Sequence, residues 1–227
     1  MKVSYYGHSS FGVEAGGKTL LFDPFISGNP LAASIKIDSL KPDFILLSHA
    51  HQDHVLDAES IARKTGATVV CNYEVYLYYS KKGLKNIRPM NPGGTFNVGN
   101  GLKIKCVVAI HTSTFDDGTN GGMPMGFVVS SDEGSFYFAG DTALTYDMKL
   151  IGEHFALKFA FLPIGDNFTM GVEDAIATCD FIRCNNIIGM HYNTFDIIKI
   201  NEAEAKSKFE KAGKGLTLMN IGETRDL

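Results

Sequence analysis

Four side chains of the kinds that bind metal ions lie within six residues, directly after a short apolar run. Segment 43–57 reads DFILLSHAHQDHVLD, and these side chains are His49, His51, Asp53 and His54. Burying one unpaired imidazole or carboxylate is costly, and burying four together is far more so. Coordination of a metal ion removes that cost. The spacing therefore favours a metal site over a solvated polar loop.

The order of these residues also indicates how they are shared between metals. His49 and His51 are two positions apart on an extended segment, so their side chains point the same way. Asp53 and His54 follow where the chain turns from the strand towards a helix. One short loop thus offers two ligands to each of two neighbouring metals.

HxHxDH after an apolar strand resembles the signature of the metallo-β-lactamase superfamily. The remaining ligands of that superfamily follow in the same order, each after a predicted strand: His111 in CVVAIHTS, Asp141 in SFYFAGDT and His191 in IIGMHYNTF. The stretches GHSSF, PIGDNFTMG and MHYNTF are similar to a narrower group of small metal-dependent hydrolases, akin to ascorbate-6-phosphate lactonase. The resemblance covers nearly all of the chain.

The resemblance implies a ligand set for two divalent metals. One metal is held by His49, His51 and His111. The other metal is held by Asp53, His54 and His191, and the carboxylate of Asp141 bridges the two. Imidazole and carboxylate suit Zn²⁺ and also accept Mn²⁺ or Fe²⁺. Two close metals lower the pKa of a bridging water, which supplies hydroxide near pH 7. Asp53 is then placed to orient the hydroxide and to pass a proton to the leaving group.

Departures from related sequences narrow the chemistry. Redox di-iron relatives place Glu where this chain has His51, which argues against a metal-dependent oxidoreductase. Family members often have Gly where this chain has Ala50 and Asp166, and an acidic Asp166 makes an anionic substrate less expected. The leading hypothesis is a di-metal hydrolase of a small ester, lactone or phosphodiester. A metal-binding regulatory protein without turnover is the alternative from another class.

His8 lies in YYGHSSF, at a turn between two predicted strands and far in sequence from the ligand loop. It is either a structural turn histidine or a residue that faces the metal centre from outside the ligand shell. Gly7 allows a close approach of the backbone, and seven ligands already fill both metals. We predict the second role, in which His8 hydrogen-bonds the developing oxyanion or protonates the leaving group.

Other residues near the predicted ligands carry two interpretations each. Asp23, beside Pro24, is either a strand-end cap or a hydrogen-bond partner of a ligand imidazole. Thr169 is interpreted as a helix N-cap in preference to a substrate contact. Asn193 and Thr194 are interpreted as loop structure in preference to substrate contacts.

Apolar runs bounded by turn residues predict strands, and apolar residues at helical spacing predict helices. The predicted strands are Val3–Tyr6, Ser10–Ala15, Thr19–Phe22, Phe44–Ser48, Thr68–Cys71, Leu102–Ile110, Met125–Ser130, Ser135–Ala139, Phe159–Ile164, Ile187–Met190 and Leu216–Met219. The main predicted helices are 57–65, capped by Asp57, 171–183, and 201–213, capped by Asn201. This order indicates an α/β fold with mixed sheets, and the resemblance implies a four-layer αββα sandwich. Residues 1–227 then form a single domain built of two packed αβ halves.

Three connecting segments receive predictions of their own. Segment 112–123 is polar and Gly-rich and follows His111, which predicts a mobile loop bordering the substrate. Segment 89–100 is turn-rich. The tyrosine-rich segment 73–80 has apolar residues at helical spacing, which indicates core contact rather than a stacking platform.

Composition excludes several classes of protein. The net charge is −4 and no basic block is present, so we expect neither nucleic-acid nor membrane binding, and a small-molecule substrate instead. The chain has no signal-type apolar core and no membrane-length apolar stretch, which predicts a cytoplasmic protein. Its four cysteines form no CxxC pattern, which favours buried, reduced thiols. The sequence does not specify an oligomeric state, and a homo-oligomer is compatible with it.

Overall fold

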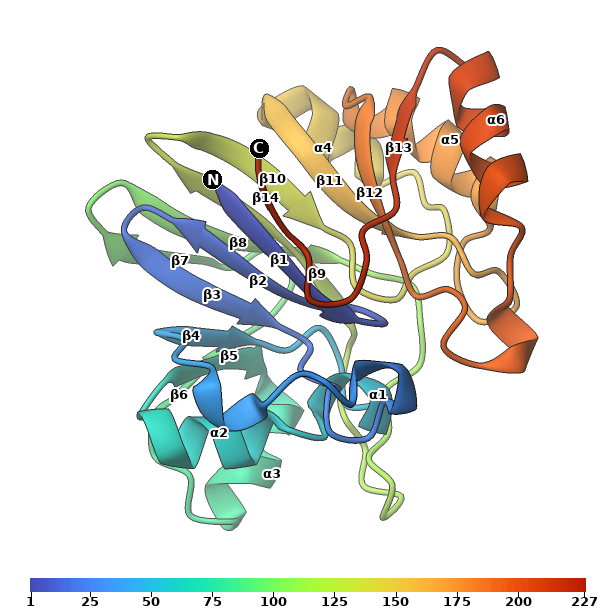
Figure 1. The fold of residues 1–227 in the computed structure, drawn as a ribbon. Helices are drawn as coiled ribbons and strands as arrows, with labels where there is room; N and C mark the ends of the chain where they lie inside the picture. The colour runs from blue at the N-terminus through green and yellow to red at the C-terminus, as the bar shows by residue number, and fades with distance from the viewer.

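Two seven-stranded sheets packed face to face form the centre of the molecule, in a computed structural model that describes residues 1–227 (Figure 1). Sheet A, in spatial order, contains β14 (Thr224–Asp226), β1 (Lys2–Gly7), β2 (Ser10–Ala15), β3 (Lys18–Phe22), β4 (Phe44–Leu46), β5 (Thr68–Asn72) and β6 (Ile87–Met90). Sheet B contains β13 (Gly215–Thr217), β12 (Asn186–Met190), β11 (Leu157–Pro163), β10 (Gly134–Phe138), β9 (Met125–Ser131), β8 (Leu102–Val108) and β7 (Thr95–Gly99).

Both sheets are mixed in the same way. In sheet A the pairs from β14 to β3 are antiparallel and those from β3 to β6 are parallel. In sheet B the pairs from β7 to β10 are antiparallel and those from β10 to β13 are parallel. The predicted α/β class with two mixed sheets is confirmed.

Helices cover the outer face of each sheet, which completes the four layers (Figure 1). They are α1 (Gln52–Val55), α2 (Ala58–Thr65), α3 (Tyr73–Lys81), α4 (Met148–His154), α5 (Val172–Ile182) and α6 (Glu202–Lys211), with short 3₁₀ turns η1 (Pro30–Ala32), η2 (Ile37–Ser39) and η3 (Asp196–Ile198). Helices α2 and α3 pack on sheet A, and α4, α5 and α6 lie on the sheet B side. None of these helices is long and apolar enough to span a membrane.

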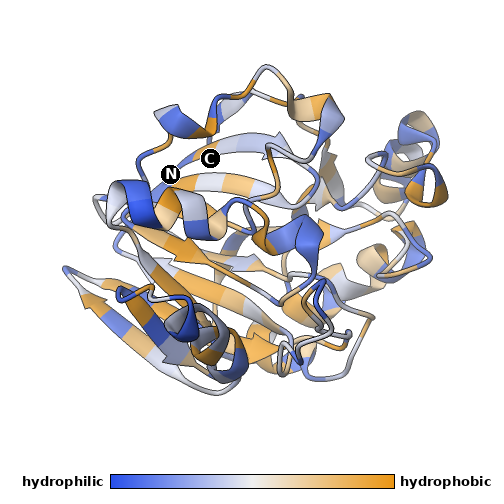
Figure 2. Cartoon of the chain, turned by 90° about the horizontal axis from the view of Figure 1, so that it is seen from below, coloured by the Kyte–Doolittle hydropathy of each residue, from blue (hydrophilic) through white to orange (hydrophobic).

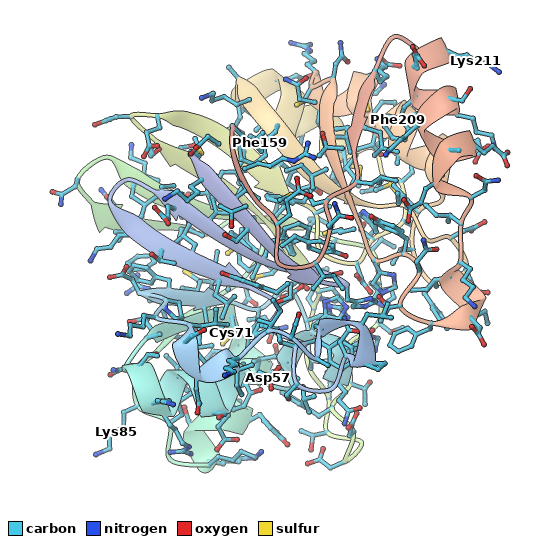
Figure 3. The ribbon with its side chains drawn as sticks, in the orientation of Figure 1. Asp57, Cys71, Lys85, Phe159, Phe209 and Lys211 are labelled. Atoms are coloured by element: carbon cyan, nitrogen blue, oxygen red, sulfur yellow. The ribbon has the colours of Figure 1, made fainter.

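The main core fills the space between the two sheets, where the inward faces of the strands are apolar (Figure 2). Phe22 of β3 stacks on Phe138 of β10, with ring centroids 4.6 Å apart. It also meets Phe136 and Phe127 edge-on, at 5.8 and 6.2 Å. Charged side chains such as Lys85 and Lys211 project outward, whereas Cys71 lies inside (Figure 3). All four cysteines are free and buried, as predicted.

Several predicted boundaries and caps are wrong. Strands β6 and β7 occupy most of the segment predicted to be turns, and β14 was not predicted at all. Asp57 stands at the start of α2, but its carboxylate accepts hydrogen bonds from the backbone N–H groups of Ile26 (2.7 Å) and Ser27 (2.9 Å) instead of capping the helix. Asn201 does cap α6, which ends at Lys211 instead of residue 213.

The tyrosine-rich helix α3 buries fewer of its aromatic residues than predicted. Tyr79 is buried, but Tyr73 and Leu77 are exposed because one face of this short helix packs on the sheet and the opposite face meets solvent. Tyr78 stacks on Phe115 with ring centroids 3.6 Å apart. The prediction of core contact therefore fails for Tyr73 and Leu77 and is confirmed for Tyr76, Tyr78 and Tyr79, which pack with the buried cluster on the outer side of sheet A.

Replacing Phe22 with Ala should lower the free energy of unfolding by about 3–5 kcal/mol, because it opens a cavity between two sheets that cannot close on it. Urea unfolding in metal-free buffer measures this change without a contribution from the metal centre. Phe168→Ala is the matched control: this phenyl ring is 53% exposed, so its loss should cost about 0.5 kcal/mol or less. Equal losses for the two variants would contradict the assignment of Phe22 to the core.

Candidate metal centre

The structure brings six of the seven histidines of the chain to one edge of the two sheets. Each predicted ligand follows the end of a strand, as expected for sites in α/β sheets: β4 precedes the HxHxDH loop, β8 precedes His111, β10 precedes Asp141 and β12 precedes His191. The seventh histidine, His154, is exposed at the end of α4.

The first group of converging side chains is His49, His51 and His111. One nitrogen from each ring lies within 4.8 Å of the others. His49 Nε2 and His51 Nδ1 are 3.0 Å apart, and the three rings are nearly perpendicular to one another. This is the triad that the resemblance assigned to one metal.

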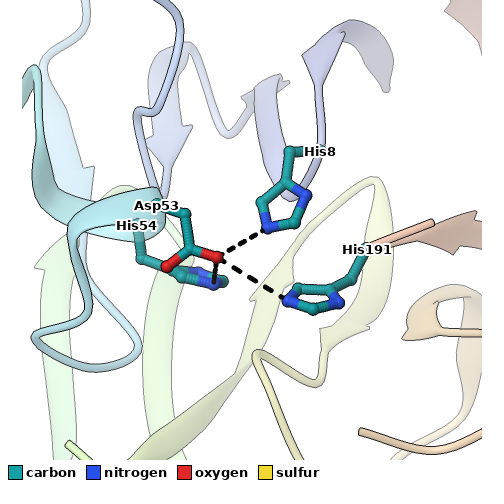
Figure 4. A group of neighbouring side chains, drawn as sticks. All are labelled: His8, Asp53, His54 and His191. Atoms are coloured by element: carbon teal, nitrogen blue, oxygen red, sulfur yellow. Dashed lines mark hydrogen bonds and ion pairs between the residues drawn. The ribbon is translucent and has the colours of Figure 1, made fainter. Parts of the chain in front are cut away.

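The second group contains Asp53, His54, His191 and also His8 (Figure 4). Asp53 Oδ2 lies 3.0 Å from His8 Nε2, 3.8 Å from His54 Nε2 and 3.9 Å from His191 Nε2. The group comes from both sheets, since His8 lies on the β1–β2 turn and His191 follows β12. It contains the second predicted triad together with the histidine predicted to face the centre.

Asp141 lies between the two groups. Its Oδ2 atom is 3.0 Å from His191 Nε2 and 3.3 Å from His54 Nε2 in the second group. The same atom is 3.5 Å from His111 Nε2 and 3.9 Å from His49 Nε2 in the first group. One carboxylate oxygen is therefore within reach of both groups.

Asp23 fixes the orientation of two of these imidazoles. Its Oδ2 atom accepts hydrogen bonds from His54 Nδ1 (2.8 Å) and from the Ser48 hydroxyl (2.5 Å), and its Oδ1 atom accepts one from the Ser48 backbone N–H (2.8 Å). Because the Ser48 hydroxyl donates to Asp23, it must accept from His49 Nδ1 at 2.9 Å. Both histidines then carry a proton on Nδ1 and turn Nε2, the atom that can bind a cation, towards the centre. Of the two interpretations of Asp23, the geometry supports a partner of ligand imidazoles.

The donor set fits metal ions. His54 Nε2 and Asp141 Oδ1 are buried and have no hydrogen-bond partner. Such atoms are costly in a protein interior unless another group satisfies them. The nitrogen lone pair of His49 also faces the His51 ring nitrogen 3.0 Å away, at the spacing of two ligands that share one ion. A divalent cation in each group would satisfy these atoms.

The pKa values of the cluster show how strongly its charges interact. Burial disfavours the charged form of His54, but Asp141, Asp53 and Asp23 outweigh burial and hold its pKa well above the ordinary value. Burial lowers the pKa of His49, and neighbouring histidines add to that effect. Without a cation, the carboxylates therefore favour a second proton on the His54 ring, in addition to the one that Nδ1 donates to Asp23. A bound cation would take over that role.

Three residues of the site adopt a left-handed backbone conformation that non-glycine residues rarely occupy. Their φ angles are 56° for His8, 40° for Asp23 and 55° for His191. Each costs roughly 1–2 kcal/mol relative to ordinary conformations. All three residues direct a side chain at the metal centre, so the backbone strain occurs where the directions of the side chains matter for the site.

His8 is buried, and both of its ring nitrogens are engaged. Nε2 lies 3.0 Å from Asp53 Oδ2 and Nδ1 lies 2.9 Å from the Thr194 hydroxyl. Burial lowers the pKa of His8 to about 4, and His191 contributes to the shift. The neutral ring donates from Nε2 to the carboxylate and accepts from Thr194 at Nδ1. His8 thus lies beside the second group, but neither nitrogen is free to contact a substrate as the sequence-based hypothesis required.

Several contacts join the loop after His111 to neighbouring segments, and its mobility stays a prediction. Ser113 Oγ accepts a hydrogen bond from the Ala50 backbone N–H (3.1 Å), and the Asn72 side chain donates to the Gly121 carbonyl (2.6 Å). Phe115 is buried against Tyr78. A Cβ atom at Gly121 would lie 2.2 Å from the Cβ of Ala50, so only glycine allows the loop to pack on the metal-binding loop. These contacts join the loop to the HxHxDH segment.

The remaining candidates are structural or peripheral. Thr169 does not cap a helix, because α5 begins at Val172 with Gly171 as its N-cap. Asn193 has a loop role, since its side chain binds Glu202 and the backbone N–H of Ile200. Asp166 is exposed and accepts a hydrogen bond from the next backbone N–H, of residue 167.

Sequence reasoning missed two contributors to the site. Ser48 is predicted only as the last residue of a strand, although its place directly before the HxH segment is a usable signal. Thr194 was interpreted as loop structure, and its contact with His8 spans 186 positions of the chain, so no local pattern indicates it.

Fold and site together define the class. The Beta-lactamase superfamily domain model matches residues 18–192, and the chain belongs to that superfamily. This confirms the resemblance read from HxHxDH and the separate downstream ligands.

Its relatives define the family more narrowly as UPF0173 metal-dependent hydrolases. The protein with that description from Flavobacterium johnsoniae is 55% identical over the full length of both chains. The one from Christiangramia forsetii is 52% identical, again over both full lengths. Among solved structures, the metallo hydrolase Igni18 from Ignicoccus hospitalis is 36% identical, with a TM-score of 0.89 over 100% of this chain and 98% of that one. The closer analogy to ascorbate-6-phosphate lactonase stays a prediction.

Replacing Asp23 with Asn should weaken metal binding by about 10- to 100-fold, because the amide NH₂ group replaces one acceptor and then faces either the Ser48 backbone N–H or the donors of Ser48 and His54. Titration against a chromophoric chelator measures the affinity. Asp57→Asn is the matched control, since Asp57 is also buried and also accepts backbone hydrogen bonds, but it contacts no histidine of the centre. Unchanged affinity in Asp23→Asn, or the same loss in both variants, would contradict the orienting role.

Proposed function

We propose that this metal-dependent hydrolase uses two divalent metal ions held by seven residues. The grouping of the side chains supports this proposal. His49, His51 and His111 converge for one ion, Asp53, His54 and His191 converge for the other, and Asp141 lies between the two groups. The observation that carries the proposal is the position of Asp141 Oδ2, 3.0–3.9 Å from nitrogens of both groups. A site for one tetrahedral ion needs four ligands and would leave the others without a purpose.

Zinc is the favoured metal, with manganese or iron as alternatives. The donors are imidazole nitrogens and carboxylate oxygens, which bind all three. Each free cysteine is buried in a strand, a helix or the turn after α5, and none takes part in the cluster, so no thiolate biases the site further. The neutral tautomers imposed on His49 and His54 by Ser48 and Asp23 suit a cation with nitrogen ligands.

The metals, when bound, would supply hydroxide near pH 7 and polarise the oxygen of the bond under attack. The chain's own residues do the rest. Asp53 is the most exposed carboxylate of the centre, with 26% of its side chain accessible, so it faces an arriving substrate. His8 holds one of its oxygens, which leaves Asp53 oriented to accept a proton and return it to the leaving group. Thr194 fixes the ring of His8 in turn.

The substrate class proposed here is a small ester, lactone or phosphodiester, acted on in the cytoplasm. Purified protein loaded with Zn²⁺ or Mn²⁺ is screened against aryl phosphodiesters, lactones and thioesters. Asp53→Asn protein with matched metal content serves as the control. Hydrolysis by the wild type that falls at least 100-fold in the control supports the proposal. Two bound metals without turnover of any substrate would favour the regulatory alternative.

Asp141→Ala should reduce the occupancy of both metal positions, because it removes the carboxylate that both groups share. Wild-type protein should retain close to two metals per chain after gentle purification, measured by elemental analysis. Glu153→Ala, on the exposed end of α4, should leave that stoichiometry unchanged. Loss of one metal alone from Asp141→Ala, or a wild-type stoichiometry fixed at one in excess metal, would contradict the shared site.

His8 acts as a positioning residue for Asp53 in this proposal. His8→Asn tolerates the left-handed backbone but cannot reach both partners, so turnover should fall about 10- to 100-fold with both metals retained. Thr194→Val should show a smaller loss, because His8 loses its second contact, and Thr194→Ser should restore activity because it keeps the hydroxyl. Equal activity in the Thr194→Val and Thr194→Ser variants would contradict the positioning role of His8 and Thr194.

A further inference from the structure

An apolar wall flanks the metal centre on the side of Asp53. We define it by Phe25, Leu56 and Phe195, which come from three separate segments. The Phe195 ring meets the His8 ring edge-on with centroids 5.4 Å apart, and the Phe25 ring does so at 5.8 Å. The two phenyl rings are 6.3 Å from each other. The His8 ring therefore contacts both the apolar wall and Asp53 of the second ligand group.

Leu56 extends the wall towards solvent. A Cβ atom at Gly28 would lie 2.4 Å from Leu56 Cδ2 and 2.8 Å from the Phe25 ring, so the absence of a side chain at residue 28 lets both residues pack there. Leu56 follows Asp53 by three positions on the same helical turn, which places the two side chains on one face. Leu56 is 39% exposed and Phe195 is 37% exposed. The apolar surface is thus open beside the most accessible carboxylate of the centre.

No Lys or Arg takes part in the ion pairs of the cluster beside this wall. Every ion pair of the cluster joins one of its own histidines to Asp23, Asp53 or Asp141. The lysine nearest to Phe195 in sequence, Lys199, is paired with Asp196 at 2.6 Å, and both are exposed. No Lys or Arg therefore takes part in the ion pairs of the cluster, and any positive charge offered to a substrate there would come from the bound cations.

The largest surface hollow of the molecule does not serve this role. It lies between α5 and α6, and its lining includes Glu173, Glu204 and Lys208. These three are already ion-paired with one another, at 2.6 and 2.9 Å. These charged side chains are therefore engaged with one another, and none of the predicted metal ligands lines the hollow.

We propose that the site takes an uncharged acyl ester or lactone that carries an aromatic or branched apolar group, seated against the exposed side chains of Leu56 and Phe195, with the buried Phe25 ring behind them. This inference rests on the proposed hydrolase function and narrows it to acyl esters and lactones that carry an apolar group. The apolar group gains from leaving water on this surface, and the acyl carbon then lies beside Asp53. In the reaction, the water oxygen bonds to the acyl carbon, the ester C–O bond breaks, and the proton goes to the departing alkoxide.

The first test compares 4-nitrophenyl esters that share one leaving group. For zinc-loaded protein, kcat/KM for 4-nitrophenyl phenylacetate should exceed that for the acetate by at least about 10-fold, after correction for spontaneous hydrolysis. 4-Nitrophenyl phosphate and bis(4-nitrophenyl) phosphate should be poorer than either. Phe195→Ala and Leu56→Ala should each reduce the phenylacetate-to-acetate ratio by about 5- to 10-fold. Leu77→Ala, on a surface residue of α3 that is 40% exposed, should leave the ratio unchanged.

The second test measures binding without turnover. Calorimetric titration of the zinc-loaded protein compares phenylacetohydroxamic acid with acetohydroxamic acid, so the difference reports the phenyl ring alone. That difference should shrink in Phe195→Ala and largely return in Phe195→Leu. If the phenyl hydroxamate binds more tightly than the acetyl one but no ester is hydrolysed, the result would contradict the proposed hydrolase function and still support the apolar site. Faster turnover of either phosphate than of the phenylacetate, or a ring effect equal in all variants, would overturn the proposed substrate class.

Discussion

Buried charge is the constraint on which this structure depends. Asp23 and Asp141 are almost completely buried, Asp53 is partly so, and six imidazoles surround them. Groups of this kind are stable in an interior only when each has a partner of the right sign and direction. The hydrogen bonds from Ser48 and His54 to Asp23 set those directions, and the inward-facing atoms without partners define where cations belong.

The fold meets this constraint by closing two sheets at one edge. A backbone hydrogen bond from His191 N–H to the His8 carbonyl (3.1 Å) joins the turn of sheet A to the strand end of sheet B inside the cluster. The strained conformations of His8, Asp23 and His191 occur at this junction. The phenylalanine core between the sheets sustains that strain, because it fixes the strand ends from which these residues project.

Contacts that are local in the chain were predictable and non-local ones were not. HxHxDH places four metal-type residues in one loop, and the strand ends before His111, Asp141 and His191 are visible as apolar runs. The sequence pattern does not predict strand β14, because Thr224–Asp226 is short, polar and exposed. Only its pairing with β1 makes it a strand. Asp57 was assigned to its helix, but backbone N–H groups about 30 positions earlier compete for its carboxylate. The apolar wall likewise joins three segments that share no pattern.

The two sheets have the same order of antiparallel and parallel strand pairs, which suits an origin of the two halves by duplication. When the sheets are aligned strand by strand, β1 corresponds to β8, β3 to β10 and β5 to β12, with β14 taking the place of β7. His8 then becomes the counterpart of His111, and Asp23 the counterpart of Asp141. An ancestral duplication followed by divergence would give this pattern. Under this proposal the histidine and aspartate of sheet B hold ions, and the residues at the same two positions of sheet A orient their neighbours.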